Sequence, residues 1–101
     1  MVVSMAKLDS IKKIINDHRQ ELKERFKITE IGIFGSYVRG EQKRRSDIDI
    51  LVEFGEPVSL LDLVGAENYI SDLIRTKVDL VPKKDVRPEL KERILNEVVY
   101  I

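Results

Sequence analysis

Two aspartates one residue apart are the feature of this sequence best suited to chemistry. Asp47 and Asp49 stand in "SDIDILVEF", whose isoleucine, leucine and valine residues predict a strand. Side chains at positions i and i+2 of a strand point to the same side, so both carboxylates would face away from Ile48 and Ile50. Two negative charges held this close repel each other, and a divalent cation with oxygen ligands relieves the repulsion. The pattern predicts a metal site, and a solvated strand end is the alternative.

A third acid stands in a later apolar stretch, "KVDLVP". If this stretch is also a strand, Asp79 would point to one side while its apolar neighbours face the core. Three carboxylates would then gather on one face of the sheet, provided that the two strands are adjacent. Lys77 would share the face of Asp79, where it would contact a phosphate or form a structural ion pair.

A glycine and a serine precede the paired aspartates. Gly35 and Ser36 follow the strand-like stretch "ITEIGIF", and ten residues separate Ser36 from Asp47. Where a strand ends and a helical turn begins, backbone N–H groups are unpaired and attract an anion. Glycine lets a phosphate approach the backbone, serine adds a hydroxyl donor, and Arg39 lies one turn further on. For this pair taken alone, the alternative is an ordinary turn with a helix cap.

Helices and strands that alternate along the chain must position these residues. The spacing of apolar residues predicts an amphipathic helix of roughly 18 to 20 residues that includes Leu8 and Leu22, with His18 in its apolar stripe. Capping residues and apolar runs predict the remaining elements: strands over 28–34, 47–54 and 77–82, and helices over 59–74 and 87–101. This order of elements indicates an α/β (α+β) domain with a small sheet of about three or four strands.

Composition bounds the size of the protein and its partners. A chain of 101 residues, of which 43% are hydrophobic, is expected to form a single domain over residues 1–101. Its 18 Lys and Arg residues balance its 18 Asp and Glu residues, so direct nucleic-acid binding is not expected. Cysteine is absent, no apolar run is long enough for a membrane span, and the start lacks the apolar stretch of a signal peptide. These features favour a cytoplasmic protein without membrane contact.

The joint spacing of these residues resembles that of the nucleotidyltransferases of the DNA polymerase beta superfamily. Average residue frequencies give the string G-S-x10-D-x-D by chance in a chain this long only on the order of once in a thousand. The fuller pattern "FGSYVRGEQKRRSDIDILV" is similar to the minimal nucleotidyltransferase (MNT) family. The resemblance implies the nucleotidyltransferase fold, a small mixed β-sheet flanked by helices. It also implies two sets of site residues: Gly35, Ser36, Arg39 and Ser46 for the nucleotide phosphates, and Asp47, Asp49 and Asp79 as the catalytic and metal-binding acids.

The same resemblance implies an activity and a partner. MNT proteins typically pair with a HEPN-domain RNase toxin and act as its antitoxin, by moving AMP from ATP to a tyrosine near the active site of the toxin. Two Mg²⁺ ions, for which Mn²⁺ substitutes, would assist the transfer, and the chain would form a hetero-oligomer with the toxin.

The sequence leaves several points of this activity open. These are the acceptor, the base preference, and whether Asp79 is a general base or only a metal ligand. One alternative is an antitoxin that acts by binding alone, with no chemistry. The other is nucleotidyl transfer to a small molecule such as an aminoglycoside.

Overall fold

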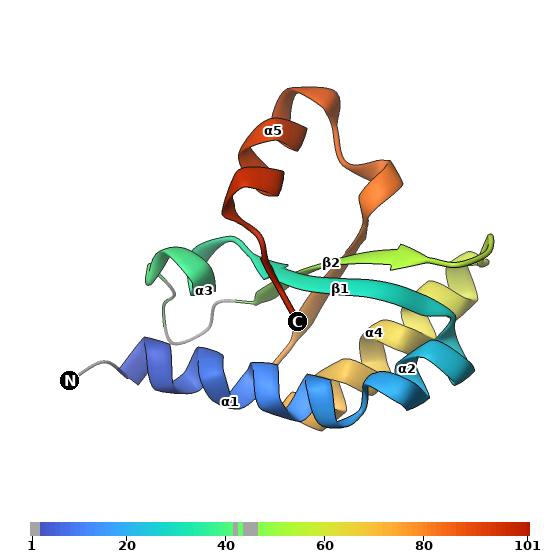
Figure 1. Ribbon diagram of the computed structural model, residues 1–101, viewed down its shortest axis with the longest axis horizontal. Helices are drawn as coiled ribbons and strands as arrows, with labels where there is room; N and C mark the ends of the chain where they lie inside the picture. The colour runs from blue at the N-terminus through green and yellow to red at the C-terminus, as the bar shows by residue number, and fades with distance from the viewer. Residues whose placement is uncertain (1–2, 42, 44–46) are drawn as a thin grey trace.

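A mixed four-stranded sheet forms the centre of the structure (Figure 1). This computed structural model describes residues 3–41, 43 and 47–101. The strands are β1 (Ile28–Phe34), β2 (Ile48–Phe54), β3 (Val78–Pro82) and β4 (Val99–Tyr100), in the order β3-β2-β1-β4 across the sheet. β1 is antiparallel to β2 and to β4, whereas β2 and β3 are parallel. The predicted fold class, a small mixed sheet flanked by helices, is confirmed.

Helices cover the two faces of this sheet unequally. The helices on one face are α1 (Val3–Asp17), α2 (Arg19–Phe26) and α4 (Leu60–Ile74), and the helix over the other face is α5 (Pro88–Glu97) (Figure 1). Two short helices lie in the connections: α3 (Ser36–Arg39) and the 3₁₀ helix η1 (Lys83–Asp85). Parallel neighbouring strands need a crossover connection, which α4 supplies between β2 and β3. Within the described ranges, no helix combines the length and the apolar character needed to cross a membrane.

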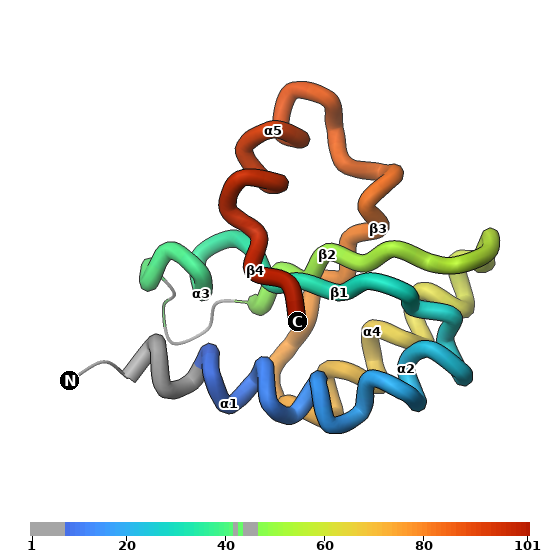
Figure 2. Tube along the Cα trace, viewed as in Figure 1, coloured from blue at the N-terminus to red at the C-terminus, as the bar shows by residue number. Residues whose placement is uncertain are grey.

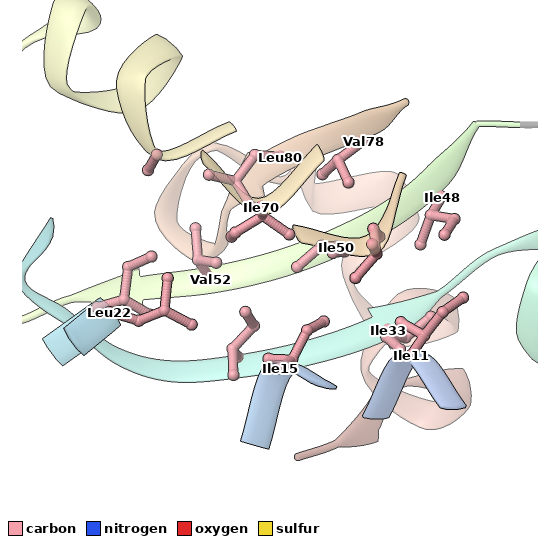
Figure 3. Packing of buried hydrophobic residues seen from close by; sticks show 14 of the residues in the cluster. Ile11, Ile15, Leu22, Ile33, Ile48, Ile50, Val52, Ile70, Val78 and Leu80 are labelled. Carbon is pink, nitrogen blue, oxygen red and sulfur yellow. The ribbon is translucent and has the colours of Figure 1, made fainter. Parts of the chain in front are cut away.

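The hydrophobic core lies between the sheet and the helices α1, α2 and α4 (Figure 3). The strands contribute fully buried side chains that include Ile33, Ile48 and Ile50, and the helices contribute Ile15, Leu22 and Ile70. Fully burying an aliphatic side chain stabilises a fold by roughly 1.5 to 3 kcal/mol, so these contacts fix which residues of β2 face the helices. Because side chains alternate along a strand, Asp49 must face the side on which α5 lies.

A capping box begins α4. Ser59 Oγ accepts a hydrogen bond from the Asp62 N–H (3.1 Å), and the Asp62 carboxylate accepts one from the Ser59 N–H (3.1 Å). The two bonds satisfy N–H groups that the first turn of a helix leaves unpaired. The start of the crossover helix is therefore fixed by two side chains that are close in the sequence.

The predicted single helix around Leu8 and Leu22 is wrong, because the structure divides it at His18. The His18 N–H donates to the carbonyl of Ile15 (3.1 Å), three residues back, instead of to the carbonyl of Ile14, four residues back. The ring Nδ1 of His18 donates to that freed Ile14 carbonyl instead (2.8 Å). His18 is half-buried and forms the corner between α1 and α2.

The end of the chain also differs from the prediction of a helix over 87–101. α5 ends at Glu97, and the chain then returns to the sheet as β4, beside β1 (Figure 2). Val99 pairs with Ile33, and Tyr100 pairs with Gly32. The run "VVYI" consists of β-branched and aromatic residues, which favour a strand where a sheet edge is open. The helical period of the preceding residues hid this strand, which is only two residues long.

Candidate active site

Asp49 and Asp79 lie opposite each other on adjacent strands. β2 and β3 pair in parallel, and their register places Asp49 directly beside Asp79. The residues that flank these acids along both strands are buried against the helices, so the two carboxylates face the other side of the sheet. Asp47 immediately precedes β2. The structure therefore brings together two of the acids singled out in the sequence, with the third one residue outside the strand.

The charges of these acids act on one another. Burial raises the pKa of Asp49 above its ordinary value, and the nearby carboxylates of Asp79 and Asp47 raise it further. Arg39 acts in the opposite direction. A bound cation would relieve the repulsion, and carboxylate oxygens with open positions around them are the ligands that Mg²⁺ prefers. The donor set at this face of the sheet fits a divalent metal ion.

Asp47 forms an ion pair with Lys77. Its Oδ2 lies 3.9 Å from Lys77 Nζ, and the two side chains are 45% and 81% exposed. In the part of the chain that the structure describes, no three acidic, histidine or cysteine side chains already stand close enough to hold a metal ion. An exposed ion pair contributes only about 0 to 1 kcal/mol, so Asp47 can leave Lys77 at little expense in stability. A site that contains all three acids therefore requires side-chain movement from the positions described, and Asp47 is free to contribute to it.

Gly35 forms the turn between β1 and α3. Its φ of 82° and ψ of −153° lie in a region that glycine alone adopts readily. A Cβ atom at this position would collide with Oδ2 of Asp49. Sequence reasoning gave a different reason for this glycine, the close approach of a phosphate. In the structure, the carboxylate of Asp49 lies against the turn, and only a residue without a side chain allows that contact.

Ser36 and Arg39 are the first and last residues of α3. The Arg39 guanidinium donates from Nε to Glu41 (2.8 Å) and from Nη1 to Glu97 (2.8 Å), and these carboxylates raise its pKa, so the group stays charged. Among the described residues, none accepts a hydrogen bond from Nη2 of Arg39. Ser46, the fourth residue assigned to the nucleotide, lies outside the described residues.

Glu97 belongs to this region, and sequence reasoning missed it. Its carboxylate accepts hydrogen bonds from the Gly35 N–H (2.7 Å) and from Arg39 Nη1 (2.8 Å). Burial opposes the charge of Glu97, but the hydrogen bonds from Arg39 and Gly35 outweigh burial and lower its pKa. The sequence held no local signal for this residue, because the end of α5 at Glu97 and the two partners, 62 and 58 positions away, are visible only in the fold.

The arrangement sets cation ligands beside anion donors. Asp49 and Asp79 supply carboxylate oxygens, and α3, which begins next to Asp49, supplies the Ser36 hydroxyl and the Arg39 guanidinium. A phosphate chain with its metal ion needs both kinds of group within a short distance. The geometry is therefore suited to phosphoryl or nucleotidyl transfer.

Known proteins resemble the chain over nearly its whole length. The protein adenylyltransferase MntA of Thermococcus cleftensis is 46% identical over 99 residues, which are 98% of this chain and 100% of that protein. A protein of Methanocaldococcus jannaschii, provisionally named a protein adenylyltransferase, is 49% identical over 98 residues, which are 96% of this chain and 100% of that protein.

Solved structures share the fold. One, provisionally named a minimal nucleotidyltransferase, has a TM-score of 0.71 and 30% identity, and the match covers 88% of this chain and 93% of that one. Another contains a tri-AMPylated Shewanella oneidensis HEPN toxin in complex with MNT antitoxin. Its match has a TM-score of 0.60 and 19% identity, and covers 97% of this chain and 71% of that one. An identity this low shows likeness of fold alone.

The family model described as "Nucleotidyltransferase domain" matches residues 15–101. The match includes every acid of the candidate site and the turn at Gly35. The family predicted from the spacing of these residues, and the class of enzyme predicted with it, are confirmed by this match and by the names of the relatives. The chain belongs to the nucleotidyltransferase domain family, among relatives that are minimal nucleotidyltransferases.

Proposed function

We propose that the chain, as one domain over residues 1–101, transfers AMP from ATP to a hydroxyl group of a partner protein. The observation that carries this proposal is the register of β2 and β3, which sets Asp49 beside Asp79 next to the turn at Gly35. The names of the relatives, protein adenylyltransferases, favour a protein over a small molecule as the acceptor.

The reaction forms one bond and breaks another. The acceptor oxygen attacks the α-phosphorus of ATP, the bond from that phosphorus to the β-phosphate bridging oxygen breaks, and pyrophosphate leaves. Two divalent cations such as Mg²⁺, held by Asp47, Asp49 and Asp79, would neutralise the phosphates and lower the pKa of the acceptor hydroxyl. Asp79 is exposed, whereas Asp49 is half-buried. We therefore assign Asp79 to the acceptor side, where it takes the hydroxyl proton or completes the metal site.

The phosphates of ATP would be held from α3. The Ser36 hydroxyl and the Nη2 donors of Arg39 are the groups that we assign to the β- and γ-phosphates, with Ser46 as a further contact. The Gly35 N–H is not assigned to a phosphate, because it already donates to Glu97. The role of Gly35 is to form a turn that leaves room for the Asp49 carboxylate. Charge-assisted hydrogen bonds of this kind mainly position the triphosphate and neutralise its charge.

The acceptor that we propose is a tyrosine of a HEPN-domain RNase toxin in the cytoplasm, bound to this chain as a hetero-oligomer. The fold likeness to a structure that contains a tri-AMPylated HEPN toxin with MNT antitoxin supports this partner. Addition of AMP to the toxin would then make this chain an antitoxin.

Mass spectrometry tests the proposal directly. A HEPN toxin co-expressed with this chain is purified and incubated with ATP and Mg²⁺, and its tyrosine peptides are searched for added AMP. We expect AMP on the toxin with the wild-type chain and none with Asp49→Asn, which retains the shape of the side chain without its charge. A toxin that carries no AMP after incubation with the wild type would contradict the proposal and favour an antitoxin that acts by binding alone.

A further inference from the structure

Glu97 connects the C-terminal helix to the turn that the proposed function assigns to ATP. One carboxylate oxygen accepts from the Gly35 N–H (2.7 Å), and the other accepts from Arg39 Nη1 (2.8 Å). The Glu97 side chain is 15% exposed. These contacts cross 62 positions of sequence to Gly35 and 58 to Arg39. A single carboxylate thus cross-links α5 to Gly35, just before α3, and to Arg39, the last residue of α3.

Two roles are consistent with a carboxylate in this position. It could hold the turn in place while ATP binds, or it could occupy donors that the phosphates need and leave when ATP arrives. The second role requires Glu97 to withdraw. Withdrawal would break the hydrogen bonds from Arg39 and Gly35 that stabilise the charged form of Glu97 and lower its pKa.

The surrounding chain also holds Glu97 where it is. Glu97 ends α5, and the Val98 N–H still donates to the helix at Ile94 (2.9 Å). On its other side the chain enters β4, where Val99 pairs with Ile33 of β1. The backbone of this residue is therefore anchored by a helix on one side and by a strand on the other.

Arg39 retains donors for a ligand while it is bound to Glu97. A guanidinium has five N–H donors in one plane. Nε is directed to Glu41 and Nη1 to Glu97, each at 2.8 Å, which fixes the plane and the direction of Nη2. A group that is oriented before its ligand arrives loses less conformational entropy on binding.

We propose that Glu97 is a positioning residue for the nucleotide. It fixes the Gly35–Ser36 turn and orients Arg39, so that the remaining guanidinium donors and the Ser36 hydroxyl meet the phosphates of ATP in a preformed arrangement. This inference rests on the proposed function, since it requires that ATP binds at this turn.

The test compares ATP binding by Glu97→Gln with binding by the wild type, using isothermal titration calorimetry with ATP and Mg²⁺ in the absence of any acceptor. Glutamine keeps the size of the side chain but loses the charge that holds Arg39. The dissociation constant of ATP should rise about tenfold, which corresponds to about 1.4 kcal/mol. Glu92→Gln, an exposed carboxylate on the same helix, is the matched control and should bind ATP like the wild type.

A double-mutant cycle distinguishes positioning from simple support of the fold. If Glu97 acts through Arg39, most of the effect of Glu97→Gln on ATP affinity should be absent when Arg39 is already alanine. A loss of general stability would instead be the same in both backgrounds. Glu97→Asp, which keeps the charge on a shorter side chain, should recover part of the ATP affinity, and it serves if Glu97→Gln folds poorly.

Three results would overturn this inference. Unchanged ATP affinity in Glu97→Gln, well below its melting temperature, would leave Glu97 with a structural role only. Tighter binding would show that the carboxylate competes with the phosphates. If the wild type binds ATP, either of these results contradicts only the role of Glu97. The third result, a wild type that binds no ATP, contradicts the proposed function as well.

Discussion

The charged form of Asp49 destabilises the folded protein when no cation is bound, and it stabilises a complex of the protein with a cation. Its pKa is raised by burial and by the neighbouring carboxylates of Asp79 and Asp47, so its charged form is opposed by the fold. A cation bound between the acids would attract the Asp49 carboxylate and replace the repulsion with a favourable interaction. The binding of metal and nucleotide should therefore be coupled to the stability of the whole fold.

The melting temperature of the protein should rise when Mg²⁺ and ATP are added together. A ligand that binds only the folded state stabilises it by about 2.7 kcal/mol at one hundred times its dissociation constant. The double variant Asp47→Asn with Asp49→Asn should lose this rise, because it removes the charges that attract the cation. Thermal unfolding, measured with and without Mg²⁺ and ATP, gives the result.

Asp72→Asn is the control for this measurement, because Asp72 is an exposed acid on α4, away from the site, and its variant should keep the rise. In the absence of metal, the double variant should be no less stable than the wild type, since it removes like charges that repel. The same rise in the double variant as in the wild type would place the metal and the nucleotide elsewhere.

Gly35→Ala should destabilise the protein more than Gly40→Ala. Both glycines have a positive φ, 82° and 72°, so each substitution is opposed by backbone strain of about 1 to 3 kcal/mol. A Cβ at Gly40 would meet no atom within 4 Å, whereas one at Gly35 would collide with the Asp49 carboxylate. The difference between the two free energies of unfolding, from chemical denaturation, reports the contact with Asp49 together with the larger backbone strain at Gly35, whose ψ of −153° lies outside the left-handed region that Gly40 occupies. Equal values would show that neither the contact with Asp49 nor the unusual ψ of Gly35 constrains the turn.

The residues of the site differ in how far the sequence could reveal them. Asp49 and Asp79 could be identified from the sequence, because alternation along a strand and the apolar residues around them are local patterns. The reason why position 35 must be a glycine could not be identified from the sequence, since it depends on which side chain packs against the turn. Glu97 was missed because its partners, Gly35 and Arg39, are far away in the sequence, and only the path of the chain after α5 brings them together.

At the scale of elements, Glu97 lies at the site because the chain returns from α5 to the sheet. β4 can lie beside β1 because Gly32 has no side chain. A Cβ at Gly32 would stand 2.6 Å from Val98 Cγ2 and 3.1 Å from the Tyr100 ring. The short strand and the glycine opposite it therefore act together, and the position of Glu97 depends on both.

Gly32→Ala should push β4 away from β1 and loosen Glu97. Overpacking of this kind typically destabilises a protein by about 1 to 3 kcal/mol. ATP affinity should fall as well, in the same direction as for Glu97→Gln, because both changes free the turn at Gly35. Chemical denaturation and calorimetry with ATP and Mg²⁺ measure the two effects.

Gly65→Ala is a control that should change the stability of the protein in the opposite direction. Gly65 lies within α4, and a Cβ there would meet no atom within 4 Å. Alanine is favoured over glycine in a helix by roughly 0.5 to 1 kcal/mol, so this variant should be more stable and bind ATP normally. Wild-type stability and ATP affinity in Gly32→Ala would contradict the role of β4.

The longer elements were predictable, and the two errors have a common cause. The strands around Asp49 and Asp79 and the helix α4 have periodic apolar residues and clear end signals. The break at His18 depends on a ring that bonds to the Ile14 carbonyl, and β4 depends on the open edge of β1. Helical periodicity continues through both places, because a local pattern does not include contacts made by distant parts of the chain.

At the scale of the whole molecule, the site is assembled from segments that lie far apart in the sequence. The turn at Gly35, the acids of β2 and β3 and the end of α5 meet on the face of the sheet that is opposite the core. The formal net charge of the chain is zero, so the charges that we propose bind ATP and a metal ion are unbalanced only locally. Recognition of a partner protein must likewise rest on a local surface and not on the field of the molecule.

Turnover distinguishes an enzyme from an antitoxin that masks its toxin. If the chain transfers AMP, one molecule can inactivate many toxin molecules, so a substoichiometric amount with ATP and Mg²⁺ should abolish toxin RNase activity over time. Asp79→Ala should abolish this effect and still bind the toxin, because one exposed carboxylate in the site contributes little to a protein interface. RNase assays over a range of molar ratios, with and without ATP, measure the stoichiometry. Protection that needs about one molecule per toxin, ignores ATP and survives Asp79→Ala would show that binding alone neutralises the toxin.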